Sequence, residues 1–110
     1  MDNEKMYEIA FQIIVHAGES RSLSSEAMDA AENYDFEKAE ELLKKANDEF
    51  LECHQIQTDL LTAEANGESS PVNIILVHSQ DHLTMATMAM ENANRIIKMY
   101  KKLEKLEEKK

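Results

Sequence analysis

The chain has 110 residues, of which 43% are apolar, so it can form one domain with a modest hydrophobic core but has no room for a second. Its 22 acidic residues outnumber the 12 basic ones and give a formal net charge of -10, which disfavours binding to nucleic acid or anionic lipid. Because no apolar run approaches the roughly 20 residues that span a bilayer, no signal-peptide pattern opens the sequence and the lone Cys53 has no disulfide partner, we expect a cytoplasmic protein without direct membrane insertion.

Two interruptions divide the chain into helical segments. Only two Gly and one Pro occur, which is typical of long helices. The first break, residues 33–35, ends in Asp35, a good N-cap for the next helix. The second break, residues 66–71, contains Gly67, suited to end a helix, and Ser70-Pro71, suited to cap and begin one.

The breaks predict helices near residues 4–32, 36–65 and 71–106. At about 1.5 Å per residue each would be roughly 45 to 55 Å long, and short turns between long helices force them to run antiparallel. We therefore expect residues 1–110 to form a single all-α domain, an up-down-up three-helix bundle.

The first segment has one apolar face, formed by Met6, Ile9, Ala10, Ile13, Ile14 and Ala17. Gly18 follows within the same segment. Because Gly costs a helix about 1 kcal/mol relative to Ala, we expect another element to approach the backbone there.

The second segment carries a coiled-coil-like seam. Its members alternate in steps of three and four residues: Phe36, Ala39, Leu43, Ala46, Phe50, Cys53, Gln57 and Leu60. Gln57 is the polar member, and it either fixes the register between helices or supports a functional site. We expect Cys53 to be a small core residue and not a reactive thiol, because only His54 near it is basic.

The third segment is apolar over too wide an arc for two neighbouring helices to cover. At about 100° per residue the arc spans roughly 220° and leaves a strip that we expect to face water, with Gln80, Thr84, Thr87, Glu91, Asn94 and Lys98. Exposing the excess apolar surface would favour aggregation, so we expect a homo-oligomer with this helix at its centre. Cyclic symmetry would then bring copies of Asp81 together.

Residues 77–83, Val-His-Ser-Gln-Asp-His-Leu, place three titratable groups on one face of this apolar helix. Residues three and four apart are helical neighbours, so His78 lies next to both Asp81 and His82. Zinc is disfavoured, because the Glu of the metalloprotease helix motif is absent and no third soft ligand is clearly placed. A better interpretation is that His78 accepts a phosphoryl group, since a neutral imidazole is nucleophilic and its phosphoramidate is labile enough to pass the group on.

Residues 77–83 also resemble the active helix of the lactose/cellobiose-type enzyme IIA of the bacterial sugar phosphotransferase system. Residues 17–22 resemble the first-helix signature of this family, residues 30–39 its first turn, and residues 54–58 its second-helix pattern. These motifs recur in the right order and at the right separations over nearly the whole chain. The resemblance implies a cytoplasmic homotrimer of three-helix subunits.

The resemblance further implies the partners and the roles of the site residues. The histidine matching His78 accepts phosphate from the histidine-containing phosphocarrier protein and donates it to a cysteine of enzyme IIB, which serves the membrane permease enzyme IIC. We expect His82 to orient or hydrogen-bond at the site, and Gln80 is a further candidate there. The aspartate matching Asp81 gathers around the threefold axis with a divalent cation, for which oxygen-only ligation indicates Mg²⁺.

The motif looks closer to cellobiose and chitobiose members than to lactose members, in which Met and Gly are associated with the positions of Val77 and Ser79. We therefore expect a role in the uptake of a β-linked disaccharide of the cellobiose or chitobiose kind. Since this subunit would never touch the sugar, the difference can act only through the surface offered to enzyme IIB.

A non-enzymatic three-helix interaction module is the alternative from a different class. Residues 33–46, taken alone, resemble segments of helical proteins whose grooves bind partner helices. This alternative leaves the His-Asp-His patch unexplained. His16 and His54 lie outside that patch, and we expect both to be structural.

Overall fold

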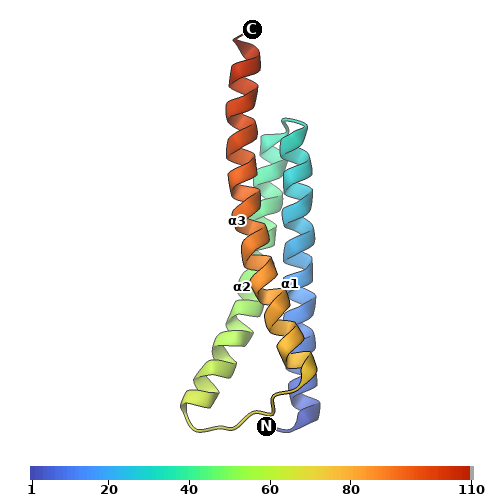
Figure 1. Ribbon diagram of the computed structural model, residues 1–110, viewed down its shortest axis with the longest axis vertical. Coiled ribbons are helices and arrows are strands. Elements are labelled where there is room, and N and C mark those ends of the chain that lie inside the picture. Colours follow the sequence, from blue (N-terminus) through green and yellow to red (C-terminus); the bar gives the residue numbers. More distant parts are fainter. Residues whose placement is uncertain (110) are drawn as a thin grey trace.

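Three long helices form the computed structural model, which describes residues 1–109 (Figure 1). They are α1 (Asn3–Glu32), α2 (Phe36–Ala65) and α3 (Ile74–Glu108). The chain runs up, down and up again, so α1 and α3 are parallel and α2 is antiparallel to both. The bundle measures 62 × 21 × 18 Å, and the C-terminal end of α3 extends past the α1–α2 turn (Figure 1). The predicted all-α up-down-up bundle is therefore confirmed.

The helix boundaries agree with the predicted ones except at the start of α3. We expected this helix to begin at residue 71 with Ser70 as its cap, but it begins at Ile74 with Asn73 as the N-cap. The Asn73 side chain accepts a hydrogen bond from the backbone N–H of Leu76 at 3.0 Å. Asn is among the best N-cap residues, and its bond to the first helical turn outweighs the preference of Pro for the first helical position.

Both turns close with the same backbone pattern. After α2, the N–H of Gly67 bonds to the Glu64 carbonyl and the N–H of Glu68 to the Ala63 carbonyl, both at 3.0 Å. This is a Schellman motif, and Gly67 adopts the left-handed conformation at φ 89°, as its predicted place requires. The α1–α2 turn repeats the pattern with Tyr34 at φ 61°, which costs a non-glycine residue roughly 1 kcal/mol.

Small side chains fill much of the core. One cluster of buried residues consists of Ile13, Ala17, Cys53 and Ala86, and a second, nearer the α1–α2 turn, consists of Ala30, Ala31, Ala39 and Ile97. Ala39, Ala46 and Cys53 of the predicted α2 seam are fully buried. Cys53 lies in a buried cluster, which confirms that it is a core residue, and this burial raises the pKa of its thiol.

Large apolar side chains of α3 remain outside the core. Met88, Met99 and Leu106 are 57%, 66% and 60% exposed, so α1 and α2 leave part of the wide apolar arc uncovered, as expected. Within residues 1–109, no helix combines the length and the apolarity needed to cross a bilayer.

Two expectations about helix surfaces are wrong. Gln80 was assigned to the strip facing water, but it is half-buried because its Nε2 donates a hydrogen bond to Oε1 of Gln57 on α2, at 2.8 Å. A Cβ atom at Gly18 would meet nothing within 4 Å in the described part of the chain, so no other element of the subunit approaches the backbone there.

Tyr34 lies at the end of the bundle where α1 ends, among the rings of Phe36 and Tyr100, whose centroids are 6.1 and 6.5 Å away. The hydrogen bond of the Tyr34 hydroxyl to Glu107, followed by loss of solvent contact and the negative charge of Glu107, raises the pKa of Tyr34 to about 12. The last turns of α3 are thereby tied to the α1–α2 turn through a protonated phenol.

The raised pKa predicts a specific loss of stability in alkali. The folded pKa of Tyr34 exceeds the usual value of 10.0, so its contribution to stability is complete below that pH and is lost as the pH rises toward about 12. We expect tyrosinate absorbance to show one transition near pH 12 that Tyr34→Phe removes, that Glu107→Ala moves toward 10.0, and that the matched control Tyr7→Phe leaves in place. A late transition that survives Tyr34→Phe would contradict this assignment.

Candidate active site

Two histidines of α3 form a close pair one helical turn apart. The ring centroids of His78 and His82 are 4.5 Å apart, the ring planes are inclined at 88°, and the two Nε2 atoms are 3.1 Å apart. This separation is a hydrogen-bond distance. Because residues four apart are neighbours on a helix, the backbone of α3 by itself brings the rings together, as their spacing predicts.

His82 is held in its neutral form. Its ring is half-buried, and its Nδ1 atom is buried without a hydrogen-bond partner in residues 1–109. Burial lowers the pKa of His82, and the positive charges of His78 and Arg21 lower it further, against a smaller opposing effect of Asp81. With its pKa below the usual value of about 6.5, His82 is neutral at neutral pH and carries a single N–H.

The buried Nδ1 atom of His82 determines which ring nitrogen carries that proton. A proton on Nδ1 would leave a buried N–H without an acceptor, whereas a proton on Nε2 leaves only an unused lone pair. Unpartnered buried N–H groups are the rarer of the two in folded proteins, so we assign the proton to Nε2. His82 then donates to Nε2 of His78, which fixes His78 as the tautomer with its proton on Nδ1 and its lone pair on Nε2.

His78 is solvent-exposed, unlike its partner. Its ring is therefore accessible to a reactant from solution, and its Nε2 lone pair, oriented by the hydrogen bond from His82, has to be released from that bond before it can attack. A neutral imidazole in this state is suited to covalent, nucleophilic group transfer.

Asp81 lies beside the histidine pair and points away from the bundle. It is exposed, and residues at its i+4 and i+7 positions, Met85 and Met88, are exposed as well. Within residues 1–109, no group of three or more His, Cys, Asp and Glu side chains could hold a metal ion. A single subunit thus offers one carboxylate, and a hard cation, which takes about six oxygen ligands or more, would need copies of it.

Gln80 is directed toward α2 and not toward the histidines. Its hydrogen bond to Gln57 joins α2 and α3 at the level of the site. Residues two apart on a helix do not face each other, so Gln80 lies on a different side of α3 from His78. The neighbouring Ser79 is buried, with its hydroxyl bonded to the Leu76 carbonyl at 2.6 Å. Gln57 therefore helps to fix the register between α2 and α3, which is one of the two roles considered for it, and its support of the site stays a prediction.

The remaining histidines have other contacts. Nδ1 of His16 lies 2.7 Å from Oε2 of Glu49 and links α1 to α2, and the His54 ring lies 5.7 Å from the Phe50 ring on α2. Sequence reasoning missed one residue near the pair, Arg21 of α1, whose charge acts on His82. The sequence held one indication that Arg21 has another role. No acidic residue stands three or four positions away, so no carboxylate of its own helix is placed to pair with its charge.

Comparisons with known proteins agree with this geometry. The family described as the PTS system, lactose/cellobiose-specific IIA subunit, matches residues 8–101. The chain is 42% identical to the lichenan-specific phosphotransferase enzyme IIA component of Bacillus subtilis, over 92% of each chain. Among solved structures, the cellobiose-specific enzyme IIA of Bacillus anthracis is similar, with a TM-score of 0.88, 38% identity and 94% of both chains covered.

A further similar structure is the chitobiose IIA of Escherichia coli in its complex with HPr, with a TM-score of 0.76 and 30% identity, over 88% of this chain and 94% of that one. The match in sequence, the match in fold and the exposed histidine on α3 all lead to one assignment. The chain belongs to the lactose/cellobiose-specific IIA subunits of the phosphotransferase system.

Proposed function

We propose that this subunit accepts a phosphoryl group on Nε2 of His78 from the histidine-containing phosphocarrier protein and donates it to a cysteine of enzyme IIB. IIA components of this system are phosphotransferase proteins, which excludes the purely non-enzymatic interaction module. The observation that carries the proposal is the 3.1 Å contact between the Nε2 atoms of His78 and His82, which orients an exposed nucleophile. The complex of the chitobiose relative with HPr supports the donor.

The transfer balances without any further reactant. The Nε2 lone pair of His78 attacks the phosphorus of the donor's phosphohistidine, and a new N–P bond forms as the donor's N–P bond breaks. The electron pair of the broken bond stays on the donor's ring nitrogen. The donor ring takes up one proton while the His78 ring releases its Nδ1 proton. A cysteine thiolate of enzyme IIB then attacks the same phosphorus, so that an S–P bond forms as the N–P bond to His78 breaks. The electron pair of that bond stays on Nε2, and the His78 ring takes a proton back on Nδ1.

His82 acts at both stages in this proposal. Before transfer its Nε2–H occupies the lone pair of His78 and holds the ring in place. The N–H leaves this lone pair as the lone pair attacks phosphorus, and it is then free to donate to a phosphoryl oxygen. His82 is thus a positioning residue first and a phosphoryl-binding residue afterwards.

The exposed face of α3 supports assembly as a homotrimer. Met85, Met88 and Met99 leave apolar surface uncovered next to Asp81, and threefold symmetry would bury it. Three ionised Asp81 carboxylates brought together would repel one another, and a divalent cation offsets that charge. Oxygen ligation suits Mg²⁺, which would organise the trimer axis and take no part in the phosphoryl step.

The transported sugar is of the β-linked disaccharide class in this proposal, with cellobiose or chitobiose favoured over lactose. Relatives named for lichenan and for cellobiose support this choice. Of the two positions that distinguish the motif, Val77 is 53% exposed and Ser79 is buried. Val77 is therefore the residue through which the subunit would select its enzyme IIB. The transfer would take place in the cytoplasm, and enzyme IIB would serve the permease enzyme IIC.

Replacing His78 should remove phosphoryl transfer without unfolding the subunit, because the side chain is exposed. We expect His78→Ala to take no label from the phosphorylated carrier while its helical circular dichroism is unchanged. The matched control His54→Ala, also at an exposed α2 position, should label normally, and His82→Ala should label about tenfold more slowly for want of one hydrogen bond to a charged group. Stable labelling of His78→Ala on another histidine would overturn the assignment.

Removing the Asp81 charge should preserve the trimer and abolish retention of the metal. We expect Asp81→Leu to sediment as a trimer at least as stable as the unmodified protein, since repulsion is relieved and apolar surface is added. Metal analysis should find Mg²⁺ in the control Asp48→Leu but not in Asp81→Leu. Complete dissociation of Asp81→Leu would mean that the carboxylates attract through the metal more than they repel.

The choice of enzyme IIB should follow Val77. We expect the phosphorylated subunit to donate faster to a cellobiose-type than to a lactose-type enzyme IIB, by the several-fold that one rim residue contributes to partner choice. Val77→Met should narrow the difference, and the buried-site variant Ser79→Gly should not. Equal rates of the unmodified protein with both purified partners would refute the sugar class and leave the phosphocarrier role intact.

A further inference from the structure

Arg21 of α1 is a half-buried arginine without a carboxylate partner in a strongly acidic chain. The positions three and four residues away carry no charge: Ala17, Gly18, Ser24 and Ser25. The ion pairs found within residues 1–109 use other bases: His16, Lys45 and Lys101. Partly burying a guanidinium without a counter-charge is unfavourable, so a partner from outside the subunit is indicated.

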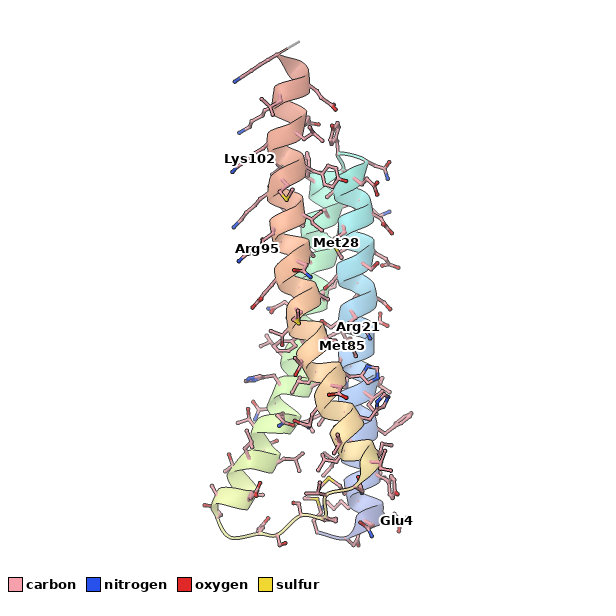
Figure 2. All side chains as sticks on the ribbon, viewed as in Figure 1. Glu4, Arg21, Met28, Met85, Arg95 and Lys102 are labelled. Atoms are coloured by element: carbon pink, nitrogen blue, oxygen red, sulfur yellow. The ribbon has the colours of Figure 1, made fainter. Side chains whose placement is uncertain are left out.

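The Arg21 side chain reaches toward the histidine pair. Helical side chains lean toward the N-terminus of their helix. Because α1 is parallel to α3, the Arg21 side chain is directed toward the N-terminal part of α3, where the histidine pair lies. Figure 2 shows Arg21 and Met85 at the same level of the bundle. Met85 is one turn from His82 on α3. The Arg21 charge contributes to lowering the pKa of His82, which agrees with this placement.

A phosphoryl group on His78 needs a positive charge at this place. The group carries up to two negative charges, Asp81 stands one helical turn away, and the whole chain has a formal net charge of -10. Arginine is the side chain best matched to phosphate, because its planar guanidinium donates two parallel hydrogen bonds. We propose that Arg21 binds the phosphoryl oxygens on His78 and stabilises the phosphorylated state, an inference that rests on the proposed role of His78.

The surroundings of Arg21 leave space for such a group. Gly18 lies one turn before Arg21 on the same face of α1, and a Cβ atom there would meet nothing within 4 Å in the described chain. The phosphoryl group would lie between the Nε2–H of His82 and the guanidinium of Arg21. Both donors are present before transfer, so the acceptor site is preorganised for the charge that arrives.

Arg21→Gln and Arg21→Lys provide the test, with Arg95→Gln as the matched control. Arg95 is the other arginine, exposed on α3 and well removed from the pair (Figure 2). Each protein is equilibrated with the phosphorylated histidine-containing carrier, and the phosphoryl distribution and the phosphorus NMR resonance of the phosphohistidine are measured. We expect Arg21→Gln to lower the equilibrium constant for transfer by about tenfold and to shift the resonance. Arg21→Lys, which keeps the charge but not the paired donors, should restore part of the loss, and Arg95→Gln should match the unmodified protein.

The outcomes separate this inference from the proposed function. If the unmodified protein takes no phosphoryl group on His78, the proposed function fails. If it does, and Arg21→Gln shows the same distribution and resonance, or Arg95→Gln shows the same loss, the role of Arg21 is refuted. If circular dichroism shows that Arg21→Gln does not fold, Arg21→Lys is measured in its place. A phosphohistidine resonance of Arg21→Lys identical to that of the unmodified protein then overturns the proposal.

Discussion

The close packing of small side chains between α1 and α3 is the constraint on which the rest of the structure depends. Ala17 packs with Ala86 in one buried cluster, and Ala31 packs with Ile97 in the other. Small contact residues let two helices approach closely, so the subunit is narrow and its two parallel helices support each other along most of their length. The large side chains of α3, such as Met88, are consequently left on the outside. One packing arrangement therefore gives the histidines a rigid base and leaves apolar surface on the outer face of α3.

This rigid base explains how a reactive pair can be built from so few residues. The backbone of α3 sets the spacing of His78 and His82, and the hydrogen bond between them sets the tautomer. The arrangement has a cost, because Nδ1 of His82 is buried without a partner and burying a polar atom unpaired is unfavourable. That cost secures a neutral ring whose only N–H points at the nucleophile. Buried polar atoms without a hydrogen-bond partner are often found at functional sites, where they lower the stability of the fold locally.

Local sequence rules predicted most of the fold, because they describe contacts within a few residues of each other. The α2 boundaries, the left-handed Gly67 and the His78–His82 contact all follow from helical spacing and turn chemistry. The start of α3 was placed wrongly because Ser70 and Asn73 compete as N-caps. The hydrogen bond that Asn73 accepts from the Leu76 N–H decides between them, and helix propensity alone does not predict that bond. Gln80 and Arg21 were misjudged or missed for a different reason. What each contacts depends on how the helices are placed side by side, which the spacing within one helix does not determine.

The unequal burial along α2 has a consequence for motion. Beyond Cys53, α2 has no fully buried residue, and Figure 1 shows its C-terminal half leaning away from α3. At the same level α1 and α3 still bury Met6, Ala10 and Ser79. Segments with few buried contacts open first in hydrogen exchange, so this half of α2 should exchange its amides well before the rest of the bundle does. His78 and His82 both stand on α3, which keeps its buried contacts with α1, so this end of α2 could open many times during one cycle, each time breaking the Gln57–Gln80 hydrogen bond, while the pair keeps its spacing.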